Sequence, residues 1–437
     1  MEKLKQKILL FVFAFLVSAT SIHALNISPS YTSSEHVLLG NKVTLYFSST
    51  DPGQKGAIIH LANGLSLTYG EILSLPDFYE IVGSPIALAK NNIERNARFL
   101  AAFQSFAKDP NGVAEVRKIM DIIYDEMKMV DEGMKQGLTP EEIYKAIGHD
   151  NDRKYNCVTG GGCSSYTWLL FPGRYLKLAM QDYDHFGQNA WISYVTGHRL
   201  AIEQAVLAHQ TGDISQLETA YAINAFACHF LSDRFAAGHI RTPRQEAAEH
   251  VTPSTVGSLV VNFMHEEENA SSLHVHNRNG DHWLAYGDKS YFNQKNDTHR
   301  EILDKTLQAS ADQVFAAYIT GSPSHEIDTV YNLIPQADEV ENMGHYDISP
   351  LFYWDTHSQN LMRRSEISNP YDRHWTANWW GWTTLIELQR LKGLTEIDQA
   401  QLALSNLAEK AVQDGLITNK EIVAFVKHRS RHSKTAF

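Results

Sequence analysis

The segment with the clearest capacity for chemistry runs from Cys228 to His239 and reads Cys-His-Phe-Leu-Ser-Asp-Arg-Phe-Ala-Ala-Gly-His. On an α-helix, His229 and Asp233 are four positions apart and project from the same face. An imidazole and a carboxylate placed in this way can hold one Zn²⁺ ion between them. Gly238 offers a helix end, so that His239 can return towards the same place from a turn. The alternative explanation of the pair is an exposed, capped helix without a metal.

Further residues of the ligand types accompany this segment in order along the chain. His185 stands before it, and His265, Glu268 and Asn269 follow it. On a helical turn, Glu268 and Asn269 lie three and four positions beyond His265, and therefore on its side of the helix. Either of them can add a polar oxygen beside that imidazole. A solvated run of glutamates is the alternative explanation.

Two weaker candidates, His60 and Asp77, lie upstream. His60 belongs to a predicted hairpin, where alternation places it opposite Ile59, so one of the two faces inwards. Asp77 stands at the start of the chain that leads into the helices. The full set consists of imidazoles and carboxylates. This composition suits a zinc site with room for water, because closed structural zinc sites are usually rich in cysteine.

Most of the elements that must position these residues are predicted to be helices. Apolar residues recur at three- and four-residue spacing in many segments, which is the period of an amphipathic helix. The predicted helices cover 87–108, 111–135, 139–147, 173–182, 189–211, 215–236, 300–320, 378–393 and 395–414. The third of them begins with Thr139-Pro140-Glu141-Glu142, which is typical of a capped helix start.

Strands are predicted over 42–48 and 57–68, and the second range folds back at Asn63-Gly64. Another small hairpin is predicted over 273–286, turning at Arg278-Asn279-Gly280. Asn-Gly dipeptides between apolar runs are strong signals for such turns. Residues 25–40 are polar and are expected to be irregular. The predicted fold class is mainly α with small β-hairpins.

Residues 1–24 have the features of a secretory signal peptide. A basic start is followed by ten apolar residues, Ile8 to Val17, and by small residues up to Ala24. A membrane-spanning helix needs about 20 apolar residues, so this run is too short for one. No later segment is apolar enough to span a bilayer, and the sequence therefore predicts a secreted protein without a transmembrane segment.

Export makes the three cysteines informative, because disulfides persist in oxidising compartments. Cys157 and Cys163 flank a loop with three glycines and are expected to form a disulfide. Six positions apart, they do not have the spacing of a metal-binding pair. Cys228 lies in an apolar helical run and is expected to be a buried free thiol.

The composition of the 437-residue chain sets further limits. With 43% hydrophobic and 20% charged residues, the chain has enough apolar side chains for a core. The net charge of −12 argues against a general nucleic-acid-binding protein. Five of the eight tryptophans lie between Trp354 and Trp382. We therefore expect a catalytic domain over 25–322 and a partly helical, Trp-rich C-terminal region over 323–437.

The order of the candidate ligands resembles that of zinc-dependent bacterial phospholipases C, which share an α-helical fold with zinc nucleases of the P1/S1 type. The run His229-Phe-Leu-Ser-Asp233 is similar to the His-Tyr-Leu-Gly-Asp helix of that family. The strings Asn63–Gly70 and Tyr286-Gly287-Asp288 look like those of larger secreted phosphatidylcholine-hydrolysing members. The resemblance covers about residues 55–320.

The resemblance implies two or three zinc ions. A first zinc would be held by Asp77, His185, His229 and Asp233. Asp233 would be shared with a second zinc, for which His60 and His36 compete. A third would be held by His239, His265 and Glu268. Two departures concern the last two sites: cleavage after Ala24 leaves Leu25 instead of the family's terminal Trp, and Asn269 stands where the family has an acid.

The function implied by this resemblance is hydrolysis of phosphatidylcholine-type phospholipids to diacylglycerol and phosphocholine by zinc-activated water, with Asp77 also orienting that water. The partner would be phospholipid at a membrane surface, not nucleic acid. One alternative is a zinc-dependent nuclease or phosphatase of the P1/S1 type. Another is a non-enzymatic secreted protein with structural zinc, whose Trp-rich C-terminal region binds a surface. Those aromatic residues either pack into a core or reach a lipid interface.

Overall fold

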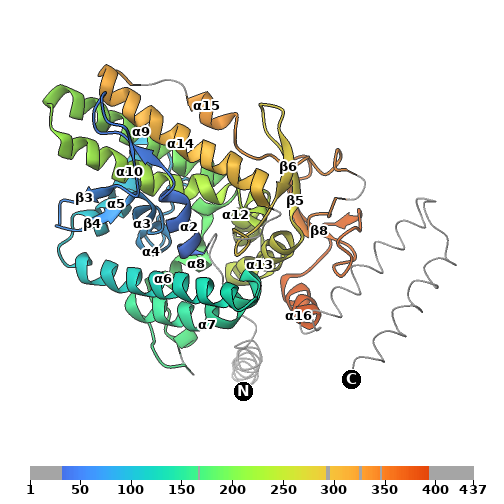
Figure 1. Cartoon of the computed structure of the whole chain (residues 1–437). Helices are drawn as coiled ribbons and strands as arrows, with labels where there is room; N and C mark the ends of the chain where they lie inside the picture. The colour runs from blue at the N-terminus through green and yellow to red at the C-terminus, as the bar shows by residue number, and fades with distance from the viewer. Residues whose placement is uncertain (1–31, 166–167, 292–295, 324–326, 345–346, 393–437) are drawn as a thin grey trace. The chain divides into compact units, whose positions relative to one another are not determined.

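The structure is a computed structural model that describes residues 32–165, 168–291, 296–323, 327–344 and 347–392 (Figure 1). The predicted signal peptide and the helix predicted over 395–414 lie outside the described residues. Within the described ranges, no helix is both long enough and apolar enough to cross a membrane.

The chain is mainly helical, with small antiparallel sheets, and this confirms the predicted fold class at that level. The α-helices are α2 (Ser33–Gly40), α3 (Tyr69–Leu73), α4 (Pro76–Tyr79), α5 (Asn92–Ala107), α6 (Gly112–Lys135), α7 (Pro140–Val158), α8 (Arg174–Gln181), α9 (Gly187–Thr211), α10 (Ile214–Asp233), α11 (Ala237–Ile240), α12 (Arg244–His250), α13 (Ser254–Ser271), α14 (Asp297–Thr320), α15 (Ile327–Tyr331) and α16 (Gly381–Lys392). Two 3₁₀-helices, η1 (Trp168–Leu170) and η2 (Tyr183–His185), stand on either side of α8.

In the part of the chain that the structure describes, the strands form three two-stranded sheets and one three-stranded sheet, all antiparallel. The pairs are β1 (Thr44–Leu45) with β2 (Gln54–Lys55), β3 (Ile58–His60) with β4 (Ser66–Thr68), and β5 (Leu273–His276) with β6 (His282–Ala285). The three-stranded sheet has the order β7 (Phe352–Asp355), β8 (Asn360–Arg364), β9 (Trp375–Thr376). The hairpins predicted at Asn63-Gly64 and at Arg278-Asn279-Gly280 are therefore present.

The chain divides into two compact units. Among the described residues, the first comprises the ranges 32–245 and 265–337, and the second comprises 246–264 and 338–392. The sequence predicted one domain boundary, between residues 322 and 323, so that each domain was a single continuous segment. In the structure, by contrast, the segment 246–264 belongs with the C-terminal part, and residues 323–337 belong with the first unit.

The first unit is built around α9 and α10, which pack along each other, with α14 against both (Figure 1). Every residue of α10 from Ala220 to Asp233 is buried. Small side chains permit this close packing: a side chain at Gly197 of α9 would collide with the ring of Phe99 and with Ala227 of α10. Close packing on all sides makes α10 a rigid support for the residues at its end.

The segment before the first predicted strand departs from expectation. Residues 25–40 were expected to be irregular, but Ser33–Gly40 forms the buried helix α2. The backbone N–H of Thr32 donates to Glu35 Oε2 at 3.1 Å, which is half of a capping box. The overall polarity of the segment hid this helix, because its serines and its glutamate are themselves buried.

The cysteines agree with the prediction. Cys157 and Cys163 form a disulfide, and Cys228 is a buried free thiol. The Asn156 side chain also ties this loop: its amide donates to the carbonyl oxygen of Gly162 at 2.9 Å, and its own oxygen accepts from the N–H of Gly173 at 2.6 Å. The disulfide and the hydrogen bonds of Asn156 therefore hold the loop independently of each other.

The second unit has its own core, built from apolar residues of the segment 246–264, the three-stranded sheet and α16. Its buried members are Ala247, Val251, Val256, Val260, Val261, Met264, Leu351, Phe352, Leu361, Leu385 and Leu388. Trp354, Trp379 and Trp382 pack against this core while remaining partly exposed. Trp380 is 62% exposed. Core packing thus accounts for three of these tryptophans but not for Trp380.

Candidate metal centre

The buried end of α10 carries the central pair of the candidate site. His229 and Asp233 lie one turn apart, with His229 Nε2 3.3 Å from Asp233 Oδ2. Both side chains are completely buried. Helix α10 ends directly at Asp233, and the short helix α11 then brings back His239. The predicted helix face is therefore present, but the helix ends at Asp233 and not at Gly238, which lies within α11, and His239 joins a second group of residues.

Two shorter elements bring further side chains to this pair. The 3₁₀-helix η2 ends at His185, whose Nδ1 lies 2.7 Å from Asp233 Oδ2 and 3.1 Å from His229 Nε2. Helix α4 begins with Pro76, a favoured first helical residue, and therefore fixes the position of Asp77. Asp77 Oδ1 is 3.3 Å from His229 Nε2 and 3.8 Å from His185 Nδ1.

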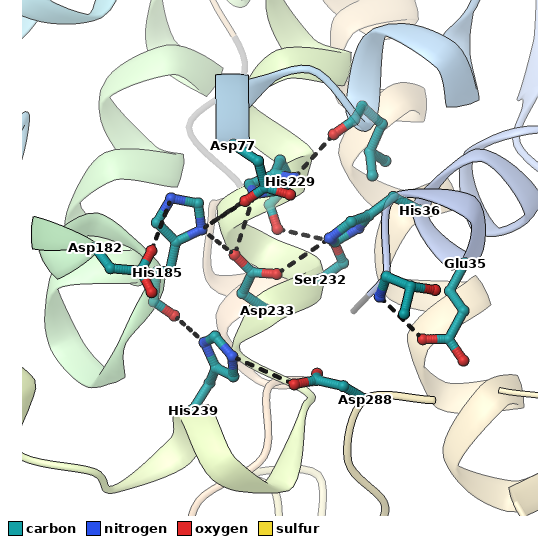
Figure 2. Close-up of polar contacts among 12 residues, drawn as sticks. Glu35, His36, Asp77, Asp182, His185, His229, Ser232, Asp233, His239 and Asp288 are labelled. Carbon is teal, nitrogen blue, oxygen red and sulfur yellow. Dashed lines mark hydrogen bonds and ion pairs between the residues drawn. The ribbon is translucent and has the colours of Figure 1, made fainter. Parts of the chain in front are cut away.

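These four side chains surround a common point (Figure 2). Five of the distances between the atoms His185 Nδ1, His229 Nε2, Asp77 Oδ1 and Asp233 Oδ2 lie between 2.7 and 3.8 Å. Ligand atoms of a tetrahedral metal ion such as zinc lie about 3.3 Å apart, since each is about 2.0–2.1 Å from the ion. His185, His229 and Asp233 therefore form one group that could hold a metal ion, and Asp77 forms another with His36 and His229.

His36 of α2 stands on the other side of Asp233. Its Nε2 is 3.4 Å from Asp233 Oδ1, the oxygen that does not face His185. Its ring lies 4.3 Å from that of His229, measured between centroids. The carboxylate of Asp233 therefore faces two groups of imidazoles with its two oxygens, as a carboxylate shared by two ions does (Figure 2). We call His36, Asp77, His185, His229 and Asp233 the first cluster.

A second cluster consists of His239 of α11, His265 of α13 and Asp288, which follows β6. His265 Nε2 lies 3.0 Å from His239 Nε2 and 3.0 Å from Asp288 Oδ2. His239 Nε2 lies 3.9 Å from Asp288 Oδ2. All three side chains are buried. These distances again match the spacing of ligands around one ion.

The imidazole rings are held by hydrogen bonds on the side that faces away from the clusters. His229 Nδ1 donates to the carbonyl oxygen of Leu73, and His239 Nδ1 donates to that of His185, both at 2.9 Å. His185 Nε2 lies 3.2 Å from the carboxylate of Glu80. A proton on the outer nitrogen leaves a lone pair on the inner one, which is the tautomer that a metal ligand needs.

Charges in the first cluster favour ionised carboxylates. Burial by itself raises the pKa of Asp233, but His229 and His185 outweigh it and hold that pKa well below its ordinary value. Burial lowers the pKa of His185, but the carboxylates of Glu80 and Asp182 outweigh it and raise that pKa well above its ordinary value. An ionised carboxylate is the form that binds a cation.

In the second cluster the two histidines differ. Burial lowers the pKa of His239. Burial also acts to lower the pKa of His265, but Asp288 and Glu266 raise it to about 9. The imidazole of His265 is therefore the one that holds a positive charge beside Asp288. A metal cation would replace that proton, because both need the same inner lone pair.

Several buried carboxylate oxygens accept no hydrogen bond from any residue that the structure describes. Asp77 Oδ2, Asp233 Oδ1 and Asp288 Oδ1 belong to the clusters, and Glu80 Oε1 lies beside His185; Glu126 Oε1, Glu268 Oε2 and Asp304 Oδ1 are in the same state outside the clusters. Leaving such atoms unsatisfied costs free energy, and bound cations would remove that cost. Together with the ligand-like spacing, these oxygens indicate that the two clusters could hold divalent metal ions.

The interpretation of these clusters depends on their own chemistry. Searches of family models, curated proteins and solved structures find no match for this chain. The donor set is imidazole nitrogen and carboxylate oxygen, without cysteine. Such sets occur in metal sites that retain positions for water or substrate, whereas structural zinc sites are usually closed by cysteines.

Two predicted ligands lie elsewhere in the structure. His60 is on the exposed edge strand β3, with 66% of its side chain exposed, and its Nδ1 lies 3.1 Å from Glu218 Oε1. His36 occupies the place for which the two histidines competed. Glu268 is buried, but its Oε1 accepts from Arg241 Nε at 2.8 Å. Asp288 supplies the carboxylate of the second cluster instead.

Signals for His36, which was predicted only as an alternative to His60, and for Asp288, which was not predicted, are present in the sequence. Thr32-Ser-Ser-Glu35 has the spacing of a capping box, and it predicts a helix that carries His36 at its fourth position. Asp288 follows the second hairpin by three residues. Hairpin closure places Asp288 near α13, but this proximity is a tertiary effect that local spacing does not show. The remaining six predicted residues all belong to the two clusters.

Proposed function

We propose that this protein is a zinc-dependent phospholipase C that hydrolyses phosphatidylcholine-type phospholipids. The observation that carries the proposal is the convergence of five histidines and three aspartates in two buried clusters with ligand-like spacing. The chain order of these residues supports it, because that order is the one that resembles the zinc phospholipases C. The predicted signal peptide supports secretion, which would bring the enzyme to membrane surfaces.

Four side chains would hold one zinc: Asp77, His185, His229 and Asp233. Asp233 would share its second oxygen with another zinc beside His36, and the second cluster would hold a third. Zinc ions in such sites act as Lewis acids that polarise a phosphoryl oxygen and make water nucleophilic near neutral pH. Burial strengthens these effects, because few water molecules screen the charges.

Asp77 has a role beyond holding a cation. Its Oδ1 faces His229 and His185, while its buried Oδ2 accepts no hydrogen bond within the described ranges. Oδ2 can therefore accept a proton from an attacking water molecule and orient its lone pair towards phosphorus. The water oxygen forms a bond to phosphorus, and the bond from phosphorus to the glycerol oxygen breaks. Phosphocholine and diacylglycerol leave, with the proton ending on the glycerol oxygen.

The net charge favours a lipid over a nucleic acid as substrate. At −12, the chain repels a polyanionic strand over long range, whereas a phosphocholine headgroup is zwitterionic. A nuclease of the same design would be expected to present a basic surface near its zinc ions. This distinction supports the lipase over the nuclease alternative.

Purified, exported protein should release phosphocholine from phosphatidylcholine vesicles. A chelator should abolish the release, and Zn²⁺ should restore it. Asp77→Asn should bind zinc with reduced affinity and remain slow even when zinc saturates it, because the amide cannot accept the proton. Degradation of single-stranded DNA without release from lipid would instead support the nuclease alternative. Zinc binding without either activity would support a structural role for the clusters.

A further inference from the structure

Asn269 contacts the second cluster without being an anionic ligand. It lies on α13 one turn beyond His265, and its Nδ2 is 3.1 Å from His265 Nε2. The same Nδ2 donates to Asp288 Oδ2 at 2.7 Å. Asn269 thus contacts both the imidazole of His265 and the carboxylate of Asp288.

The orientation of the Asn269 amide is fixed from the other side. The backbone N–H of Gly238, next to His239, donates to Asn269 Oδ1 at 2.7 Å. With its oxygen held by that donor, the amide directs its NH₂ group towards Asp288. Rotation of the amide would place NH₂ against the Gly238 N–H, so the observed orientation is the only one of the two that satisfies both contacts.

Close packing holds this arrangement. A side chain at Gly238 would collide with Asn269 Oδ1 and with His265, and a side chain at Gly287 would collide with the Asn269 side chain. The two glycines belong to the segments that carry His239 and Asp288, respectively. Asn269, which is on the same helix as His265, is therefore packed against the backbones of the two segments that carry His239 and Asp288.

We propose that Asn269 is a positioning residue that holds Asp288 in place as the metal-binding carboxylate of the second cluster. Its NH₂ group fixes Oδ2 beside His265, while Asp288 Oδ1 is buried and accepts no hydrogen bond from any described residue. Without this donor the Asp288 carboxylate keeps its contact with His265 but loses the second contact that fixes its orientation. The inference rests on the proposed function only in that the clusters bind zinc.

The test is zinc affinity, measured by competition with a chromogenic chelator on full-length wild type, Asn269→Ala, Asp288→Asn and the double variant. Wild type should show a set of tight sites. Asp288→Asn should lose one equivalent of zinc. Asn269→Ala should bind that same equivalent about 10- to 100-fold more weakly, the usual effect of removing a partner of a ligand. Adding Asn269→Ala to Asp288→Asn should change zinc affinity little, because Asn269 acts through Asp288.

Asn277→Ala is the matched control, since Asn277 also donates an amide N–H to a carboxylate, Asp281 Oδ2 at 2.9 Å, in the β5–β6 hairpin that lies between Asn269 and Asp288 in the chain. It should leave zinc affinity unchanged. If Asn269→Ala does not fold, as judged by thermal unfolding, Asn269→Ser gives the same test with a smaller perturbation. Wild-type affinity in the folded Asn269 variant, or equal weakening of all zinc sites, would overturn the inference alone. Absence of zinc from the wild type would overturn it together with the proposed function.

Discussion

At the scale of single residues, Asp233 joins the two sides of the first cluster. One of its oxygens faces His185 and His229, and the other faces His36. Its pKa is held well below the ordinary value by those imidazoles, against the effect of burial. The carboxylate therefore remains ionised in a place from which water is excluded. Removing its charge should affect more than one ion.

Asp233→Asn keeps the shape of the side chain and removes that charge. Bound zinc should fall by more than one equivalent, and phosphocholine release should fall at least 100-fold, because two ions lose a shared ligand. Zinc content by mass spectrometry and the release assay measure the two effects. Cys228→Ser is the control: its buried thiol contacts Tyr69 and Ser310 and no member of either cluster, so it should cost stability but no zinc per folded molecule. Normal zinc content in Asp233→Asn would refute the assignment of the first cluster.

Glu80 should act on zinc affinity through His185. Its Oε2 lies 3.2 Å from His185 Nε2, on the side of the ring that faces away from Asp233. Glu80→Gln should weaken zinc binding at the first cluster about 10- to 100-fold, because the carboxylate holds the ring and its tautomer. Glu126→Gln, which changes another buried glutamate, bonded to Asn151, provides the comparison. Equal zinc affinities of the two variants would show that Glu80 does not position His185.

At the scale of elements, local signals predicted the helices better than the long-range contacts. The periodic segments became α5 to α10 and α14, and Thr139 caps α7 through the N–H of Glu142, as predicted. His185, His229, Asp233 and His239 lie on or near such elements, whereas Asp77 and His265 lie on α4 and α13, which the periodicity did not predict. The same reasoning could not identify His36 and Asp288 as ligands, because the packing of α2 and of a hairpin against other elements brings them to the clusters. Spacing along the chain carries no information about that docking.

The disulfide belongs to this scale because it closes the loop between α7 and η1. Replacing both Cys157 and Cys163 with serine should lower the free energy of unfolding by about 2 kcal/mol, as expected for a short loop. Zinc affinity should stay the same, because Asn156 ties the loop independently. Chemical denaturation and zinc competition check the two expectations. A large loss of zinc in the folded variant would mean that the disulfide itself positions α8 and His185.

Helices α9, α10 and α14 meet at a buried histidine that sets a pH dependence. His198 Nε2 donates to Gln313 at 2.8 Å, and its Nδ1 accepts from Asn224 at 3.0 Å. Burial lowers the pKa of His198 to about 4. The unfolded chain binds this proton near pH 6.5, so stability should be lost as the pH falls from about 6.5 to 4, by at most about 1.4 kcal/mol per pH unit.

The His198→Gln variant isolates this contribution, since glutamine does not titrate. Its free energy of unfolding should fall less steeply than that of the wild type between pH 6.5 and pH 4, whatever its stability at pH 7. Denaturant unfolding at several pH values gives both slopes. Parallel slopes would mean that His198 is protonated in the folded protein, contrary to its donor and acceptor contacts.

At the scale of the whole molecule, both clusters belong entirely to the first compact unit. The second unit has a separate apolar core and contributes no residue to either cluster. The net charge of −12 and the predicted export together favour a zwitterionic, extracellular substrate over nucleic acid. In the proposed function the chemistry would therefore depend on the first unit alone, and it would require bound metal.

The most direct test is metal analysis of the purified, full-length protein after gel filtration, by mass spectrometry of the metals it retains. We expect about two or three zinc ions per chain, which a chelator removes and added Zn²⁺ restores. Protein that is folded by circular dichroism yet retains less than about one divalent ion per chain, and takes up none from a zinc buffer, would contradict it.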